Sequence, residues 1–299
     1  MTWTTGGAAT RGARVRRILL WALLVACIGF FIFERWPRPP PALPVPAIAR
    51  RLTSIAADWL ELDASVITRR GPPVLRVVRF DGPVEFVPYH YTRAGFAEPQ
   101  PVGTWADELR APVVVNAGQF DDKLMHLGWL KAEDIWLSEH LKPQWKALLV
   151  SGPHVGAPFS GIVDLEQNNP RVVDGYRHAV QSMMLVDDSA RVRVRDTDLV
   201  ANRTVIAQDA DGRMLILISQ GAVTLADLAR FIPTTSLKIV RAMNLDGGIE
   251  AQLAIRTPEH NETFYGQYGT GTSVLESAGG EVRLPLPAVI AVRPVSGVP

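Results

Sequence analysis

The stretch IVRAMNLDGG, residues 239–248, is the most informative part of this 299-residue chain. Its apolar, β-branched beginning predicts a buried strand. The strand would deliver a carboxylate, Asp246, to a turn made by Gly247 and Gly248. Because glycine adopts backbone conformations that other residues avoid, this turn leaves bare backbone beside the carboxylate, where a ligand can approach. The alternative is an ordinary Asp-Gly turn that binds nothing.

Short apolar runs separated by turn residues continue on both sides of this stretch, which is typical of β-structure. The expected strands are residues 74–80, 84–91, 113–115, 147–150, 180–186, 192–194, 204–206, 214–219, 239–245, 251–255 and 289–292. The sequence Asp-Gly-Pro at 81–83 predicts a hairpin between the first two. Helical spacing of apolar residues predicts one helix within 49–62, and a capping threonine predicts a second at 225–231. Many strands and few helices in irregular order predict an α+β fold, with a mixed β-sheet core in a single globular domain.

The composition narrows the class of function. Hydrophobic residues make up 47% of the chain and charged residues 20%, which suits one folded domain with an ample core. Five arginines and one glutamate lie in the first 35 residues, so the remainder holds 26 basic and 29 acidic residues. This mildly acidic body argues against a nucleic-acid-binding surface. The single cysteine, Cys27, rules out an internal disulfide and a cysteine-based metal site in the body.

The N-terminal 36 residues indicate the compartment. A basic cluster at 11–17 precedes sixteen residues, 18–33, without charge or proline. As a helix they would span roughly 24 Å, slightly less than a hydrocarbon core of about 30 Å. We expect residues 1–36 to be a cytoplasmic basic segment and an uncleaved signal-anchor helix. Residues 37–48 would form a proline-rich stalk, and residues 49–299 an extracytoplasmic, periplasmic domain on a single-pass cytoplasmic-membrane anchor.

Two other interpretations of the N-terminus remain open. Residues 24–27, LVAC, resemble the cleavage motif of a lipoprotein, in which Cys27 would carry the lipid. An ordinary cleaved signal peptide is the third, although a small-residue cleavage site is missing after the apolar run. All three interpretations place the body of the protein outside the cytoplasm.

Polar residues that follow or interrupt apolar runs are candidates for a site. Asn116 and Gln181 offer amides that suit sugar hydroxyls, and Arg203 offers a fixed cation with two-pronged geometry for phosphate. Asp246 is the leading acid, base or nucleophile, and Glu250 is a possible second carboxylate. Strand ends that gather at one edge of a sheet build a pocket on a rigid scaffold. The alternatives are structural: an Asx-turn, a satisfied amide, an ion pair and a solvated surface residue.

Two further patterns bear on metal binding. Asp121, Asp122 and His126 carry three potential ligands, but residues scattered along a loop are usually surface polar groups. The sequence DADG at 209–212 lacks the remainder of a calcium loop and predicts a hairpin turn. We therefore expect no metal and no cofactor. Glycines and tyrosines at 265–271 predict a flexible or substrate-lining loop.

Six blocks in order resemble the phosphodiester glycosidase domain family. They are VVVNAGQF at 113–120, AVQS at 179–182, NRTVIAQDADGR at 202–213, LILIS at 215–219, TLADLA at 224–229 and AMNLDGG at 242–248. The resemblance covers residues 74–293. The chain departs from the family pattern at Gln119, Ala207 and Ile249.

The resemblance implies an α+β domain that cleaves a sugar from a phosphodiester. The expected activity is that of a membrane-tethered hydrolase on an N-acetylhexosamine-1-phosphodiester linkage in envelope or extracellular glycans. Asp246 and Glu250 would be catalytic, and Asn116, Gln181, Arg203, Gly247 and Gly248 would bind the substrate. Two other hypotheses remain: a non-catalytic glycan-binding or envelope-assembly module, and a metal-dependent phosphodiesterase.

Overall fold

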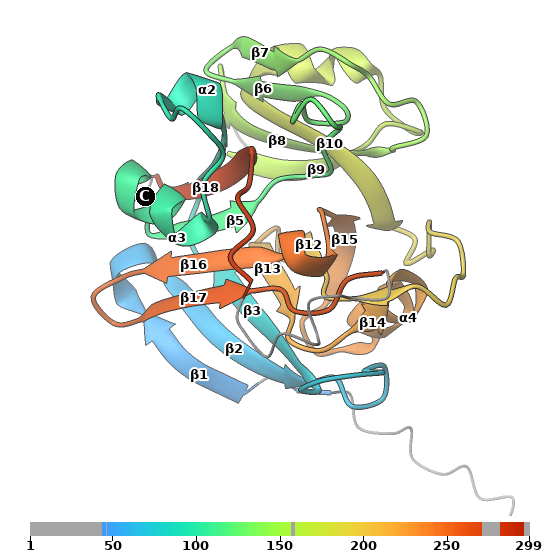
Figure 1. Cartoon of the computed structure of the whole chain (residues 1–299). Helices are drawn as coiled ribbons and strands as arrows, with labels where there is room; N and C mark the ends of the chain where they lie inside the picture. Colours follow the sequence, from blue (N-terminus) through green and yellow to red (C-terminus); the bar gives the residue numbers. More distant parts are fainter. Residues whose placement is uncertain (1–43, 46, 157–158, 271–281, 296–299) are drawn as a thin grey trace, which may run out of the picture. The chain divides into compact units, whose positions relative to one another are not determined.

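Antiparallel strand pairing organises the molecule (Figure 1). The computed structural model describes residues 44–45, 47–156, 159–270 and 282–295. They fall within one compact unit, Leu43–Pro299. The predicted basic segment, signal-anchor helix, Cys27 and most of the stalk lie outside the described residues. Within the described residues, no helix combines the length and the apolar character that a membrane crossing requires.

Two sheets hold most of the strands. The larger sheet contains β1 (Ala47–Leu52), β2 (Ala57–Asp63), β3 (Val74–Phe80), β6 (Leu130–Ala132), β7 (Ile135–Ser138), β8 (Ala147–Pro153), β9 (Ser160–Asp164), β10 (Tyr176–Val186), β12 (Thr204–Asp209), β13 (Met214–Ser219) and β15 (Ile239–Asn244). The smaller sheet contains β4 (Val84–His90), β5 (Val113–Asn116), β16 (Gln252–Arg256), β17 (Asn261–Tyr265) and β18 (Ala288–Pro294). A short pair joins β11 (Val200–Ala201) to β14 (Val223–Thr224).

Helices and single turns are short and few among the described residues. The α-helices are α2 (Tyr91–Ala94), α3 (Val102–Leu109) and α4 (Leu225–Phe231). The 3₁₀ turns are η1 (Thr53–Ile55), η2 (Pro170–Gly175), η3 (Ile232–Thr234) and η4 (Gly248–Glu250). The predominance of strands and the single unit confirm the expected α+β class with few helices.

Three apolar layers position the sheets. The main core lies between the two sheets and includes Phe80, Phe86 and Leu149. A second core lies between the larger sheet and α4, where Leu228 and Phe231 are buried. A third lies between the smaller sheet and α3, where Trp105 is fully buried. Since central strands such as β13 are covered on both faces, all six of its residues are buried, which explains its unbroken apolar sequence.

The helix expected within 49–62 is wrong. This segment forms β1, the turn η1 and β2, and Ala56 takes a left-handed conformation with φ of 47° that reverses the chain. Trp59 and Leu60 of β2 point into two different cores. A strand buried on both faces loses its alternation, so its apolar residues imitated helical spacing. The helix expected at 225–231 is confirmed as α4, capped by Thr224.

Three details of strand pairing also differ from the expectations. β3 pairs with β2 and β13, whereas β4 pairs with β18, so Asp-Gly-Pro at 81–83 links two sheets and is not a hairpin. Every pairing among the described residues is antiparallel, so the expected mixed sheet is wrong. Residues 192–194 make only an isolated bridge, Val186 to Val192. Pairings between distant segments are set by tertiary packing, which local patterns do not reveal. The hairpin turn at 209–212 is confirmed between β12 and β13.

Candidate active site

The candidate site lies where β15 of the larger sheet ends beside β5 of the smaller sheet. The backbone amide of Asp246 donates to the carbonyl of Ala117 at 3.2 Å. The Asn116 side-chain amide donates to the Asp246 carbonyl at 3.0 Å, and its oxygen accepts from the Gln252 amide at 3.1 Å. Asn116 is therefore buried and occupied with backbone groups. It fixes the position of Asp246 from the neighbouring sheet, and the structure does not turn its amide toward a ligand.

The register of β12 against β15 brings Arg203 to Asp246. Val205 lies opposite Asn244, so the residues before β12 run beside those after β15. The Arg203 guanidinium donates from Nε to the Val223 carbonyl at 3.2 Å and from Nη2 to the Leu199 carbonyl at 2.6 Å. Nη1 faces the glycine turn, since a Cβ placed on Gly247 would lie 3.3 Å from it. These two carbonyls thus orient the guanidinium, and because they are neutral they do not compensate its charge.

Burial and neighbouring charges shift the pKa values of Asp246, Glu250 and Arg203. Burial, and after it the charge of Glu250, raises the pKa of Asp246 to about 7 against the opposing effects of the Gly247 amide and Arg203. Burial also raises the pKa of Glu250. For Arg203, burial lowers the pKa to about 10, which still leaves it charged at neutral pH. A carboxyl that titrates near neutrality beside a fixed cation is suited to acid–base or nucleophilic chemistry.

The two glycines shape the turn around Asp246. The Gly247 amide donates to the Asp246 carboxylate at 2.9 Å. A Cβ on Gly247 would lie 2.7 Å from the Asn202 carbonyl, which is a clash. Gly248 has φ of +78°, and a Cβ there would lie 3.1 Å from the Glu250 carboxylate. Glu250 belongs to the turn η4, not to a strand, and the turn keeps its carboxylate close to Gly248.

Asn202 is a residue that the sequence did not single out. Its side-chain oxygen accepts from the amides of Gln267 and Tyr268, both at 2.7 Å, and its nitrogen donates to the carbonyls of Ser219 and Gln220. Its main-chain carbonyl accepts from Gly248 at 2.9 Å. Asn202 therefore fastens the loop after β17 to the glycine turn. The position of Asn202 directly before Arg203 was the only available signal.

Comparison with known proteins identifies the family of this chain. The family model described as phosphodiester glycosidase matches residues 110–292, well over half of the chain. This chain belongs to the phosphodiester glycosidase family. Asn116, Arg203, Asp246 and Glu250 all lie inside the matched region. A search of curated proteins found no match.

Solved structures are similar to this chain at low sequence identity. The catalytic domain of zebrafish N-acetylglucosamine-1-phosphodiester α-N-acetylglucosaminidase, auto-inhibited by its pro-peptide, is 13% identical with a TM-score of 0.51. The alignment covers 73% of this chain and 76% of that one. A hypothetical protein from Synechocystis is 14% identical with a TM-score of 0.49, over 79% of this chain and 62% of that one. The first likeness agrees with the α+β fold of the family.

Gln181, which we expected to bind substrate, is not brought to this site. It lies within β10, not at its end, and its side chain is fully buried. Its oxygen accepts from the amides of Trp129 and Lys142, and its nitrogen donates to the carbonyls of Lys142 and Trp145. These four bonds exhaust its hydrogen-bonding capacity. Gln181 holds the connection between β7 and β8 onto β10.

The residues of the metal hypothesis also make other contacts. The Asp121 carboxylate accepts from the amides of Lys123 and Met125, which caps its own loop. His126 is buried, with Nε2 at 3.2 Å from the Gln181 carbonyl, and burial lowers its pKa to about 4. Within the described ranges, no three of the His, Cys, Asp and Glu side chains gather in a way that could hold a metal ion. The geometry therefore gives the metal-dependent phosphodiesterase no support.

Proposed function

We propose that this chain is an active glycosidase that hydrolyses a sugar-1-phosphodiester, of the N-acetylhexosamine type, in envelope or extracellular glycans. The observation that carries the proposal is the pairing of Asp246, with a pKa of about 7, with the oriented guanidinium of Arg203. Membership of the phosphodiester glycosidase family supports the same reaction. The predicted signal anchor supports a membrane-tethered, periplasmic location.

The chemistry divides between the cation and the carboxylates. Arg203 would neutralise the phosphate, which then leaves with the bonding electrons of the anomeric carbon–oxygen bond and needs little help from a general acid. Ionised Asp246 would take a proton from the attacking water, or attack the anomeric carbon itself. Water supplies the oxygen of the free sugar, and the phosphomonoester departs. Glu250 is the second carboxylate, and after burial its charge is the next cause of the raised pKa of Asp246.

The proposal is tested with the full-length protein on a phenyl phosphodiester of N-acetylglucosamine, with free sugar as the readout. We expect turnover in the wild type and a loss of about 10³-fold or more in Asp246→Asn. Asp211→Asn is the control, because Asp211 is an exposed carboxylate in the β12–β13 turn. Saturable binding without sugar release would favour the glycan-binding module, and cleavage abolished by a chelator would favour the metal-dependent enzyme.

A further inference from the structure

A cavity of about 670 Å³ lies beside the active site, between β10, the start of β8, the segment before β11 and the start of α4. This volume falls within the roughly 300–1,000 Å³ of small-molecule sites. The apolar part of the lining consists of Trp145, Met183, Met184, Val194, Leu199 and Leu225. Methionine and leucine side chains accommodate flexible apolar ligands well.

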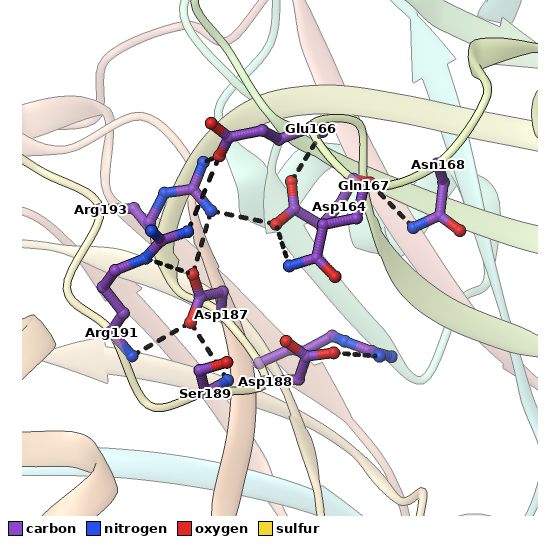
Figure 2. A network of polar contacts seen from close by, with 10 residues as sticks. Asp164, Glu166, Gln167, Asn168, Asp187, Asp188, Ser189, Arg191 and Arg193 are labelled. Carbon is purple, nitrogen blue, oxygen red and sulfur yellow. Dashed lines mark hydrogen bonds and ion pairs between the residues drawn. The ribbon is translucent and has the colours of Figure 1, made fainter.

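Basic residues complete the wall. Lys146, Arg193 and Arg195 also line the cavity. Arg193 is held by Asp164, Asp187 and Glu166, as Figure 2 shows, so its charge is already compensated. Lys146 and Arg195 form no ion pair among the described residues. The cavity is thus apolar, with two uncompensated cations beside it, a combination that suits an amphiphilic anion.

The cavity and the active site share structural elements. Leu199 lines the cavity, and its carbonyl accepts from Arg203 Nη2 at 2.6 Å. Val223, two residues before the lining residue Leu225, accepts from Arg203 Nε. On the other side, Met183 lies opposite Asn244, two residues before Asp246. The segments at Leu199 and at 223–225 thus connect the guanidinium of Arg203 to the cavity, whose own lining includes neither Arg203 nor Asp246.

We propose that this cavity binds the alcohol portion of the phosphodiester, and that this portion is an apolar, lipid-like chain. The proposal rests on the proposed function, because it assigns the half of the substrate that remains on the phosphate. The sugar would bind next to the carboxylates of Asp246 and Glu250, while the apolar lining of the cavity would bind the alcohol portion of the leaving phosphomonoester. Burial of hydrocarbon next to a bound anion gives the cavity its affinity.

The first measurement compares N-acetylglucosaminyl phosphodiesters of methanol, butanol and octanol. The protein is the full chain in lipid nanodiscs, because detergent monomers would compete for the cavity. We expect kcat/KM to rise by about fourfold for each methylene group that enters the cavity. Equal kcat/KM for methyl and octyl diesters, or a preference for the diester of a polar sugar alcohol, would overturn the proposal.

Variants separate the cavity from partitioning into the nanodisc lipid. Val194→Trp fills the cavity without a charge, and Thr197→Asp makes its exposed rim acidic without touching a residue that holds Arg203. Both should remove most of the octyl preference and leave the methyl diester cleaved at a similar rate. Val66→Asp, at an exposed apolar residue between β2 and β3, is the control and should keep the preference. Retention of the preference in both cavity variants would contradict the proposal.

Binding without turnover distinguishes the two possible failures. Calorimetric titration of the wild type should show binding of octyl phosphate but not of methyl phosphate. The Val194→Trp variant should no longer bind octyl phosphate. If no diester is hydrolysed but this binding is seen, the proposed reaction fails and the cavity assignment stands. If diesters are hydrolysed but octyl phosphate binds no better than methyl phosphate, the reaction stands and the cavity assignment fails.

Discussion

Asp187 and Asp246 are two aspartates with very different surroundings. The Asp187 carboxylate accepts from the amides of Ser189 and Arg191, and it forms ion pairs with Arg191 at 2.9 Å and Arg193 at 3.0 Å (Figure 2). The Asp246 carboxylate accepts from the Gly247 amide and forms no ion pair among the described residues. Arg203, whose charge acts on it, donates to two backbone carbonyls instead.

The difference separates a carboxylate whose charge is fully compensated from one whose charge is not. Full compensation of a buried charge stabilises the fold, because the ion pairs and amides replace the lost water. Incomplete compensation leaves a carboxylate whose pKa is raised and whose proton is exchangeable near neutral pH. Burial alone therefore does not identify the active carboxylate; the supply of hydrogen-bond donors around it does.

The strongest test of the structural role of Asp187 is the stability of the Asp187→Asn variant. Removal of the charge takes a buried ion-pair partner from both Arg191 and Arg193, although Arg193 keeps Asp164 and Glu166. We expect the free energy of unfolding to fall by about 3 kcal/mol, measured by urea denaturation at pH 7. The kcat/KM measured well below the melting temperature should stay within about twofold. A large loss of activity at full folding would contradict the structural role.

The next largest effect concerns the cation of the active site. Arg203→Lys keeps a positive charge but cannot donate to both Val223 and Leu199 while also facing the glycine turn. We expect kcat/KM to fall by about 100-fold. Arg213→Lys, in the β12–β13 turn, is the matched control and should retain activity. Wild-type activity in Arg203→Lys would show that the fixed geometry of the guanidinium is not needed.

Stability should respond to Asp246 in the direction opposite to Asp187. The folded pKa of Asp246 is raised from 3.8 to about 7, so between these values the folded state holds a proton that the unfolded state has released. Stability from this group is therefore present below pH 4 and is lost as the pH rises toward 7. We expect Asp246→Asn to be about 2 kcal/mol more stable than the wild type at pH 8.

The measurement is urea denaturation of both proteins at pH 4 and pH 8. The difference should be small at pH 4, where the carboxyl is largely protonated in the folded state and about half protonated in the unfolded state. A destabilised Asp246→Asn at pH 8 would show that Asp246 is as well compensated as Asp187.

The pH dependence of the reaction sharpens the assignment of roles. If Asp246 acts as base or nucleophile, it must be ionised, and its pKa is about 7. We expect kcat/KM to fall about tenfold for each pH unit below this value and to be level above it. A rate that falls as the pH rises through 7 would instead assign Asp246 to the general acid.

The smallest expected effect is a shift of this profile in Glu250→Gln. The charge of Glu250 raises the pKa of Asp246, so its removal should move the midpoint to lower pH by up to about one unit. The midpoint is read separately from the rate, which also changes if Glu250 takes part in the chemistry. An unmoved midpoint would mean that the two carboxylates do not interact.

Local patterns predicted the parts of the fold that local forces determine. The strand at 74–80 and the helix at 225–231 were found at their boundaries, because β-branched runs and a threonine cap act over a few residues. The glycine turn after Asp246 was found for the same reason. The strand β2 was missed because both of its faces are buried, a fact that depends on segments distant in sequence.

The candidate site shows the same division. Asp246 and Glu250 are four residues apart, so their proximity followed from the sequence, and Arg203 was a candidate because a guanidinium suits phosphate. The roles of Asn116 and Gln181 were less predictable. Both amides bond to backbone groups of distant segments, and only the folded structure shows that their capacity is used. Asn202 was missed because its five partners come together from three separate parts of the chain.

The packing of the glycine turn also restricts how this protein can change over evolutionary time. A Cβ on Gly266 would lie 2.0 Å from the Gly248 carbonyl, and one on Gly247 would lie 2.7 Å from the Asn202 carbonyl. Backbone atoms cannot move aside as flexible side chains can, so even alanine is excluded at both positions. New substrate preferences would therefore have to arise through changes at residues around Gly247 and Gly266, and not at these two positions.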